Sequence, residues 1–96
     1  MDKLKLEELY SKMMQLHERA EIVFSQDGVP SMMKNEFKNK VSQYNEMYEN
    51  CETMKLMTSK QETIDNLLNQ QAEILNVRIN WELGWVKTVL EHISNK

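Results

Sequence analysis

Glycine and proline are nearly missing from this chain, and their scarcity is what most limits the folds available to it. The 96 residues include two glycines and one proline, at Gly28, Pro30 and Gly84. Strand turns depend on these residue types, so a β-sheet would have almost nowhere to reverse direction. Leucine, methionine, lysine and glutamate, which favour helices, are abundant in the rest. We therefore expect an all-α protein, with residues 1–96 as a single helical domain.

Apolar residues recur three and four positions apart in three stretches, which predicts three helices. The first runs from about residue 2, with Asp2 as its N-cap, to about residue 24. The second spans about 31–57, after a turn at residues 25–31, and the third spans about 59–94. Because that turn is short, we expect the second helix to be an antiparallel neighbour of the first. The predicted architecture is an antiparallel three-helix bundle with a long third helix.

The first two predicted helices each carry one apolar stripe. These expected core residues are Leu6, Leu9, Met13, Leu16, Ala20 and Val23 in the first, and Met33, Phe37, Val41, Tyr44, Met47, Tyr48, Cys51 and Met54 in the second. The second stripe is rich in methionine, which packs adaptably and specifies a unique core poorly.

The boundary between the second and third helices has a weaker signal. Ser59 with Glu62, or Thr58 with Gln61, has the spacing of a capping box. The apolar periodicity also shifts there, since Lys55 and Thr58 stand where apolar residues would continue. We expect a break at this point. The alternative is a helical hairpin in which helices two and three are continuous and which dimerises into a four-helix bundle.

The third predicted helix carries two apolar stripes, although the core of a small bundle requires only one. At ~100° per residue, the first stripe consists of Ile64, Leu68, Ala72, Leu75, Ile79, Leu83, Val86, Leu90 and Ile93. The second consists of Leu67, Ile74, Trp81 and Trp85 and lies roughly 130–140° from the first. We expect the first stripe to form the core. The second needs another neighbour, either a helix of the same chain or a different chain.

The second stripe is the predicted partner-binding surface. Trp81 and Trp85 lie one turn apart beside Arg78, a composition typical of binding hot spots. The predicted binding residues are Leu67, Ile74, Val77, Arg78, Trp81 and Trp85. The alternative is that both indoles cover the open end of the bundle. Gly84, on the polar side of this helix, costs ~1 kcal/mol relative to alanine and would permit close approach of another backbone.

Charge and composition limit the partners of the protein. The net charge is −3, and the largest basic cluster, Lys34, Lys38 and Lys40, lies close to Glu36, so we expect no nucleic-acid partner. No apolar run approaches the ~20 residues of a membrane span, and the charged N-terminus lacks the apolar run of a signal peptide. The single cysteine, Cys51, excludes an internal disulfide and favours a reducing compartment. We expect a soluble intracellular protein of the cytoplasm, with the nucleus as the alternative.

No residue pattern in the sequence indicates catalysis or metal binding. His17, Glu18 and Glu21 partly match a zinc-protease helix, but the second histidine of that motif is missing. We expect Cys51 to act as a small buried apolar residue, because the nearby glutamates disfavour a thiolate. The sequence therefore predicts no enzyme activity, no cofactor and no metal.

These observations predict a non-catalytic protein–protein interaction module, either a small assembly subunit or an adaptor. Its partner would be a second copy of the chain or a helical segment of another protein, packed helix against helix as in a coiled coil or a higher oligomer. The alternative is a small helical inhibitor or chaperone that masks the binding surface of another protein. The methionine-rich stripe supports that alternative, because adaptable surfaces suit clients of variable shape.

Overall fold

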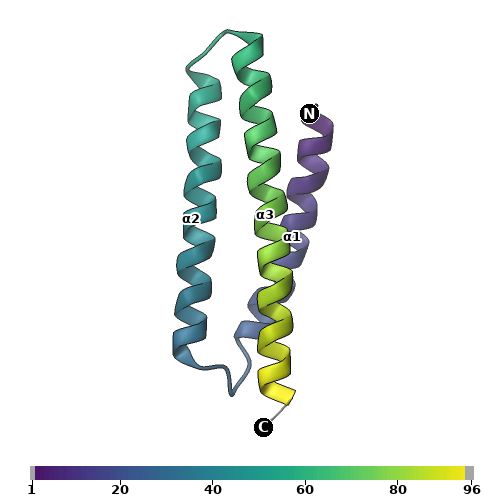
Figure 1. Ribbon diagram of the computed structural model, residues 1–96, viewed down its shortest axis with the longest axis vertical. Coiled ribbons are helices and arrows are strands. Elements are labelled where there is room, and N and C mark those ends of the chain that lie inside the picture. The colour runs from purple at the N-terminus through teal and green to yellow at the C-terminus, as the bar shows by residue number, and fades with distance from the viewer. Residues whose placement is uncertain (1, 95–96) are drawn as a thin grey trace.

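The computed structural model describes residues 2–94, which form three helices joined by two short connections (Figure 1). α1 spans Lys3–Phe24, α2 spans Ser31–Leu56 and α3 spans Gln61–Ser94. Because α3 packs against both other helices, the protein is a three-helix bundle with a long third helix, as predicted. Residues 1, 95 and 96 of the expected domain lie outside the described residues.

The first two helices begin and end where the sequence provides local signals. The carboxylate of Asp2 accepts a hydrogen bond from the backbone N–H of Lys5 at 2.8 Å, which confirms the predicted N-cap of α1. In the following turn, Gly28 has a φ of 91°, a left-handed conformation that favours glycine. Pro30, with a φ of −60°, then precedes the first residue of α2.

α2 and α3 are two separate helices. α2 ends at Leu56, α3 begins at Gln61, and the chain reverses direction between them (Figure 1). Within this connection the hydroxyl of Thr58 accepts a hydrogen bond from the backbone N–H of Lys60 at 3.3 Å. The alternative of one continuous helix is therefore wrong.

Helices α1 and α2 run antiparallel, and the backbone of each lies close to α3 rather than to the other (Figure 1). The prediction that α2 is an antiparallel neighbour of α1 is confirmed, but the two helices meet through aromatic side chains and not through close backbone approach. The reason lies in the number of apolar faces. α1 and α2 have one each, whereas α3 has two and can serve both.

The two apolar stripes of α3 face the two other helices. Leu75 of the first stripe packs in one cluster with Met13 of α1. Trp81 of the second stripe stacks on Phe37 of α2, with ring centroids 5.6 Å apart. The neighbour that the second stripe requires is therefore supplied to a large extent by the same chain.

The centre of the buried face of α3 lies between the two predicted stripes and is partly polar. Gln71, Arg78 and Glu82 are 0%, 4% and 0% exposed. By contrast, Leu83 and Leu90 of the first stripe are 53% and 44% exposed. The expectation that the first stripe alone forms the core is wrong at these two positions. A helix that packs on two neighbours buries the residues that lie between its two contact faces, here between the two apolar stripes.

The stripes predicted for α1 and α2 are buried at about half of their positions, among them Leu6 and Cys51 near their ends. Met13 and Ala20 of α1 and Phe37 and Val41 of α2 are buried. Leu9, Leu16, Val23, Met33 and Tyr48 are half-buried, and Met47 and Met54 are exposed. Because α2 lies close to α3 only and meets α1 through a few rings, no helix covers Met47 and Met54 on the flank of its stripe.

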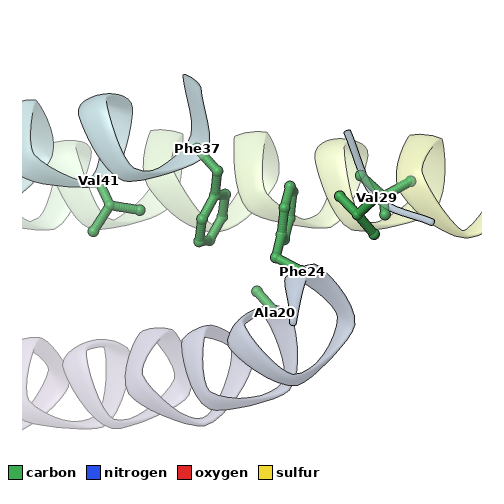
Figure 2. Close-up of a cluster of buried hydrophobic side chains, with 6 residues drawn as sticks. Ala20, Phe24, Val29, Phe37 and Val41 are labelled. Atoms are coloured by element: carbon green, nitrogen blue, oxygen red, sulfur yellow. The ribbon is translucent and has the colours of Figure 1, made fainter. Parts of the chain in front are cut away.

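Large side chains gather at the end of the bundle near the connection between α1 and α2. Figure 2 shows Phe24 of α1 and Phe37 of α2 side by side, and their ring centroids are 4.2 Å apart. This aromatic cluster consists of Ala20, Phe24, Val29, Phe37, Val41 and Val89, with Trp81 and Trp85 packed against it. Within the described part of the chain, no helix combines the length and the apolarity needed to cross a membrane.

Candidate functional site

A groove runs between α1 and α2, which we call the α1–α2 groove. It contains two open hollows of about 670 and 510 Å³. The first lies between the N-terminal half of α1 and the C-terminal half of α2, and it includes Tyr10 and Tyr48. The second lies between the C-terminal half of α1 and the N-terminal half of α2, and it includes Phe24 and Phe37. The two hollows therefore follow each other along both helices.

The space between α1 and α2 is closed by rings rather than by contact between the helix backbones. Tyr10 and Tyr48 meet with their ring centroids 5.4 Å apart. The imidazole of His17 stacks on Phe37 at 5.9 Å, and Phe24 stacks on Phe37 from the other side. Aromatic side chains therefore bridge the two helices and form part of the mainly apolar lining of the groove.

The rims of the second hollow carry opposite charges. On α2, Lys34 and Lys38 lie one turn apart, and neither ammonium group forms an ion pair with any residue in 2–94. On α1, the carboxylate of Glu21 contacts Nε2 of His17 at 3.0 Å. This hollow therefore has a basic edge on α2 and an acidic edge on α1.

Behind the groove, polar contacts centred on the buried Arg78 and Glu82 join all three helices. Arg78 of α3 donates from Nε to Oε1 of Glu82 at 3.1 Å and from Nη1 to Oδ1 of Asn45 at 2.7 Å. Nδ1 of His17 lies 3.2 Å from the same Glu82 oxygen. We define the polar layer as His17, Asn45, Arg78 and Glu82. It links one residue of α1, one of α2 and two of α3.

His17 contacts α3 through one ring nitrogen and its own helix through the other. Both ring nitrogens face carboxylate oxygens, those of Glu82 and Glu21. Through these two contacts the ring links an exposed carboxylate of its own helix to the buried carboxylate of α3. The second carboxylate oxygen of Glu82 has no hydrogen-bond partner within residues 2–94. The layer therefore concentrates charge in the core and aligns α1 with α3.

Further along the bundle, a second buried polar contact joins α2 to α3. Nε2 of Gln71 donates to Oε1 of Glu52 at 2.8 Å, and Lys55 pairs with the same carboxylate at 2.7 Å. The hydrogen bonds from Lys55 and Gln71 hold the pKa of Glu52 below its ordinary value. Burial raises the pKa of Tyr48 to about 12. It also raises the pKa of the buried Cys51 thiol, which fits the small apolar role expected for that residue.

Metal binding has no support in the described residues. No group of three or more His, Cys, Asp and Glu side chains within 2–94 is arranged so that it could hold an ion. The polar layer also differs from a metal site in composition, because its carboxylate already contacts a guanidinium. A cation at that position would meet the positive charge of Arg78.

The predicted binding residues lie together on the side of α3 that faces α2. Leu67 and Arg78 are buried, at 5% and 4% exposure. The side chains of Ile74, Trp81 and Trp85 are half-buried, and both indoles pack against the aromatic cluster. Val77 is 49% exposed. Partner binding by this set stays a prediction, and Leu67 and Arg78 could contribute to it only through the fold.

Sequence reasoning missed both the groove and the polar layer. A signal for the layer exists, since Gln71, Arg78 and Glu82 lie on the line midway between the two apolar stripes of α3. A helix that packs on two neighbours buries that line, so polar residues there must find partners in the core. The groove has no such local signal, because it results from how far apart two helices are held.

The groove and the polar layer are therefore the features from which a function can be argued. The groove offers an accessible, mainly apolar surface, whereas Arg78 and Glu82 at the centre of the polar layer are buried between the helices. Comparisons of the chain with protein-family models, with curated proteins and with solved structures find no significant match.

Proposed function

We propose that the protein is a non-catalytic protein–protein interaction module, a small assembly subunit or adaptor that holds a helical segment of a partner in the α1–α2 groove. The observation that carries this proposal is the separation of α1 from α2. Both helices pack on α3, yet two hollows that follow each other remain between them. A partner helix in that groove would contact two helices at once and complete a four-helix bundle.

The dimensions of the groove suit a helix. Its lining extends from residue 3 to residue 25 on one side and from residue 34 to residue 56 on the other. At the standard helical rise, this corresponds to about 30 Å, or about 20 residues of a partner helix. An amphipathic helix of that length presents one apolar stripe, which matches the mainly apolar lining of the groove.

The charges on the rims indicate the chemistry of the partner. Lys34 and Lys38 have no ion-pair partner in the described chain and favour acidic side chains along one edge of the incoming helix. Glu21 on the opposite rim favours a basic side chain along the other edge. These charges would fix the direction of the partner helix more than they would raise its affinity.

The test is to fill the groove without removing any core contact. Ser42 lines the second hollow, and the exposed Gln43 next to it on α2 does not. Helical peptides selected from a displayed library against the full chain should bind the wild type and Gln43→Trp, but not Ser42→Trp, in isothermal titration calorimetry. Chemical shifts of the labelled protein should change along the groove. Equal binding by both variants, or shift changes confined to other surfaces, would contradict the proposal.

The alternative of a chaperone or inhibitor has one observation of its own. Met32, Met47 and Met54 on α2 are 72%, 50% and 56% exposed. Exposed methionines suit clients of variable shape. In that case the protein would suppress light scattering by a heat-denatured model enzyme, and Met47→Gln with Met54→Gln would remove this effect while Ser42→Trp would not. No suppression at equimolar protein would exclude this alternative.

A further inference from the structure

We propose that the outer face of α3 near its C-terminal end is a self-association surface, at which two copies of the chain pack antiparallel about a twofold axis. This surface lies apart from the α1–α2 groove, which no residue of α3 lines. It is a shallow hollow of about 380 Å³ lined by Leu83, Val86, Lys87, Leu90, Glu91 and Ser94. We call it the Leu83–Ser94 face.

The apolar part of this face has no neighbour within the bundle. Leu83 and Leu90 are 53% and 44% exposed, although both belong to an apolar stripe of α3. Val86 between them is half-buried against the aromatic cluster. The exposed part of the stripe is therefore continuous with the core, and a second copy would extend the same apolar packing outward.

The face carries one positive and one negative side chain, each of which can pair with the opposite charge on a second copy. Lys87 and Glu91 lie one turn apart on α3, and neither forms an ion pair with a residue of the described chain. A lysine four residues before a glutamate is the less favourable order within a helix. In an antiparallel pair centred midway between them, Lys87 of each copy lies opposite Glu91 of the other. One patch then yields two ion pairs, as a twofold interface requires.

The same register gives Gly84 a role. A pair centred between Lys87 and Glu91 also brings Gly84 level with Ser94 of the other copy, because both pairs have the same midpoint; Gly84 lies at the polar edge of the face, beside the residues that line it. A Cβ atom added at Gly84 would meet nothing within 4 Å in the isolated chain, and its φ is not positive. The fold itself therefore does not require glycine here, although glycine weakens a helix. Small residues at this edge of the contact would let the backbones approach closely there.

The consequence for function follows from the separation of the two surfaces. A dimer through the Leu83–Ser94 face would leave the groove of each copy open, so it would offer two grooves to a partner. Linking two binding sites raises the apparent affinity for a partner with two helical segments. The face comprises only residues 83–94 of one helix, so its area is smaller than that of a standard interface of ~800 Å² per partner. We therefore expect weak dimerisation, with a dissociation constant between about 10 μM and 1 mM.

The charge pair provides the first test. Sedimentation equilibrium of the full chain over that concentration range should show a monomer–dimer equilibrium. Lys87→Glu and Glu91→Lys should each raise the dimer dissociation constant about tenfold, because each brings like charges together. The double variant should restore the wild-type value. A wild type that stays monomeric throughout, single variants that dimerise like the wild type, or a double variant that dimerises no better than the singles would each overturn the proposal.

Gly84 provides the second test. Gly84→Leu should weaken dimerisation about tenfold while it raises the helical content or melting temperature of the monomer. Asn76→Leu, an exposed position of α3 two turns earlier, is the matched control and should leave the equilibrium unchanged. Dimerisation of Gly84→Leu with wild-type affinity would overturn the proposal. The groove variant Ser42→Trp should dimerise normally, which separates a failure of this proposal from a failure of the proposed function.

Discussion

Near the connection between α1 and α2, the three helices meet through stacked rings, whereas at Arg78 and Glu82 they meet through charges. In the aromatic cluster, Phe37 contacts Phe24 at 4.2 Å and Trp81 at 5.6 Å between ring centroids. In the polar layer, Arg78 binds Glu82 and Asn45 through hydrogen bonds of 3.1 and 2.7 Å. Both regions join α1, α2 and α3, but the first does so through apolar ring contacts and the second through hydrogen bonds between charged and polar groups.

The difference shows what each region contributes. Apolar burial is non-directional, so the aromatic cluster stabilises the fold in proportion to the area removed from water. Buried charges must be paired and hydrogen-bonded, so the contacts of the polar layer form in only one relative position of the helices. We infer that the cluster supplies most of the stability and that the layer fixes the alignment of α1 and α2 along α3.

The largest effect is expected in the aromatic cluster. Phe37→Ala removes a ring that is 4% exposed and contacts residues of α1 and α3, so it should lower the free energy of unfolding by about 3–5 kcal/mol. Urea denaturation followed by circular dichroism measures this change. Leu56→Ala, at a position 87% exposed, is the control and should change the value by less than about 0.5 kcal/mol. A loss below about 1 kcal/mol for Phe37→Ala would mean that the cluster is not the main source of stability.

The next effect is expected in the polar layer. Arg78→Met leaves Glu82 buried without its guanidinium partner, which costs about 3–5 kcal/mol for an isolated buried charge. We expect the lower end of that range, because His17 still reaches Glu82 at 3.2 Å. Adding Glu82→Leu to Arg78→Met should recover most of the loss, as replacement of a whole buried pair is often neutral. If the double variant is less stable than Arg78→Met in urea denaturation, the layer contributes stability beyond alignment.

A smaller effect is expected from Tyr48 at alkaline pH. Its pKa is raised to about 12 from 10.0 because burial disfavours the phenolate. The neutral phenol therefore favours the folded state fully below pH 10, and this contribution is lost as the pH rises toward 12. Tyr48→Phe has no proton to lose, so its stability should fall less across this window than that of the wild type. Identical pH profiles in urea denaturation would show that Tyr48 titrates normally.

The smallest effect is expected from Glu52 at acid pH. Hydrogen bonds from Lys55 and Gln71 lower its pKa from 4.5, so the carboxylate favours the folded state above pH 4.5. This contribution is lost as the pH falls through the lowered pKa in the folded state. Glu52→Gln should therefore lose less stability on acidification than the wild type. The matched control is Glu49→Gln, an exposed position on the same helix, which should follow the wild-type profile.

The helices themselves could be predicted from the sequence. Gly28, Pro30 and the phase shift near Thr58 mark the breaks, and the three-to-four spacing of apolar residues marks each helix between them. These signals are local, because backbone conformation at a break or a cap depends on a few neighbouring residues. The predicted bounds differ from the observed ones by at most two residues at any end.

The functional surfaces could be predicted less well. The sequence indicated that α3 has two apolar faces, and the structure shows that α1 and α2 cover most of both. Reasoning from the two stripes assigned Leu83 and Leu90 to the core and gave no place to Gln71 or Glu82, which are fully buried. A helical wheel shows which residues share a face, but the neighbour that covers the face, and how much of it, depends on distant parts of the chain.

What the sequence alone determined is thus the number, the length and the apolar faces of the helices, because these follow from hydrogen bonding and periodicity within each segment. Only the tertiary structure decided that α1 and α2 both pack on α3 and stand apart from each other, leaving the groove. The physical reason is that helix packing depends on how side chains of different helices interlock. Tyr10 with Tyr48, and Phe24 with Phe37, meet across long sequence separations, and no local pattern specifies their contact.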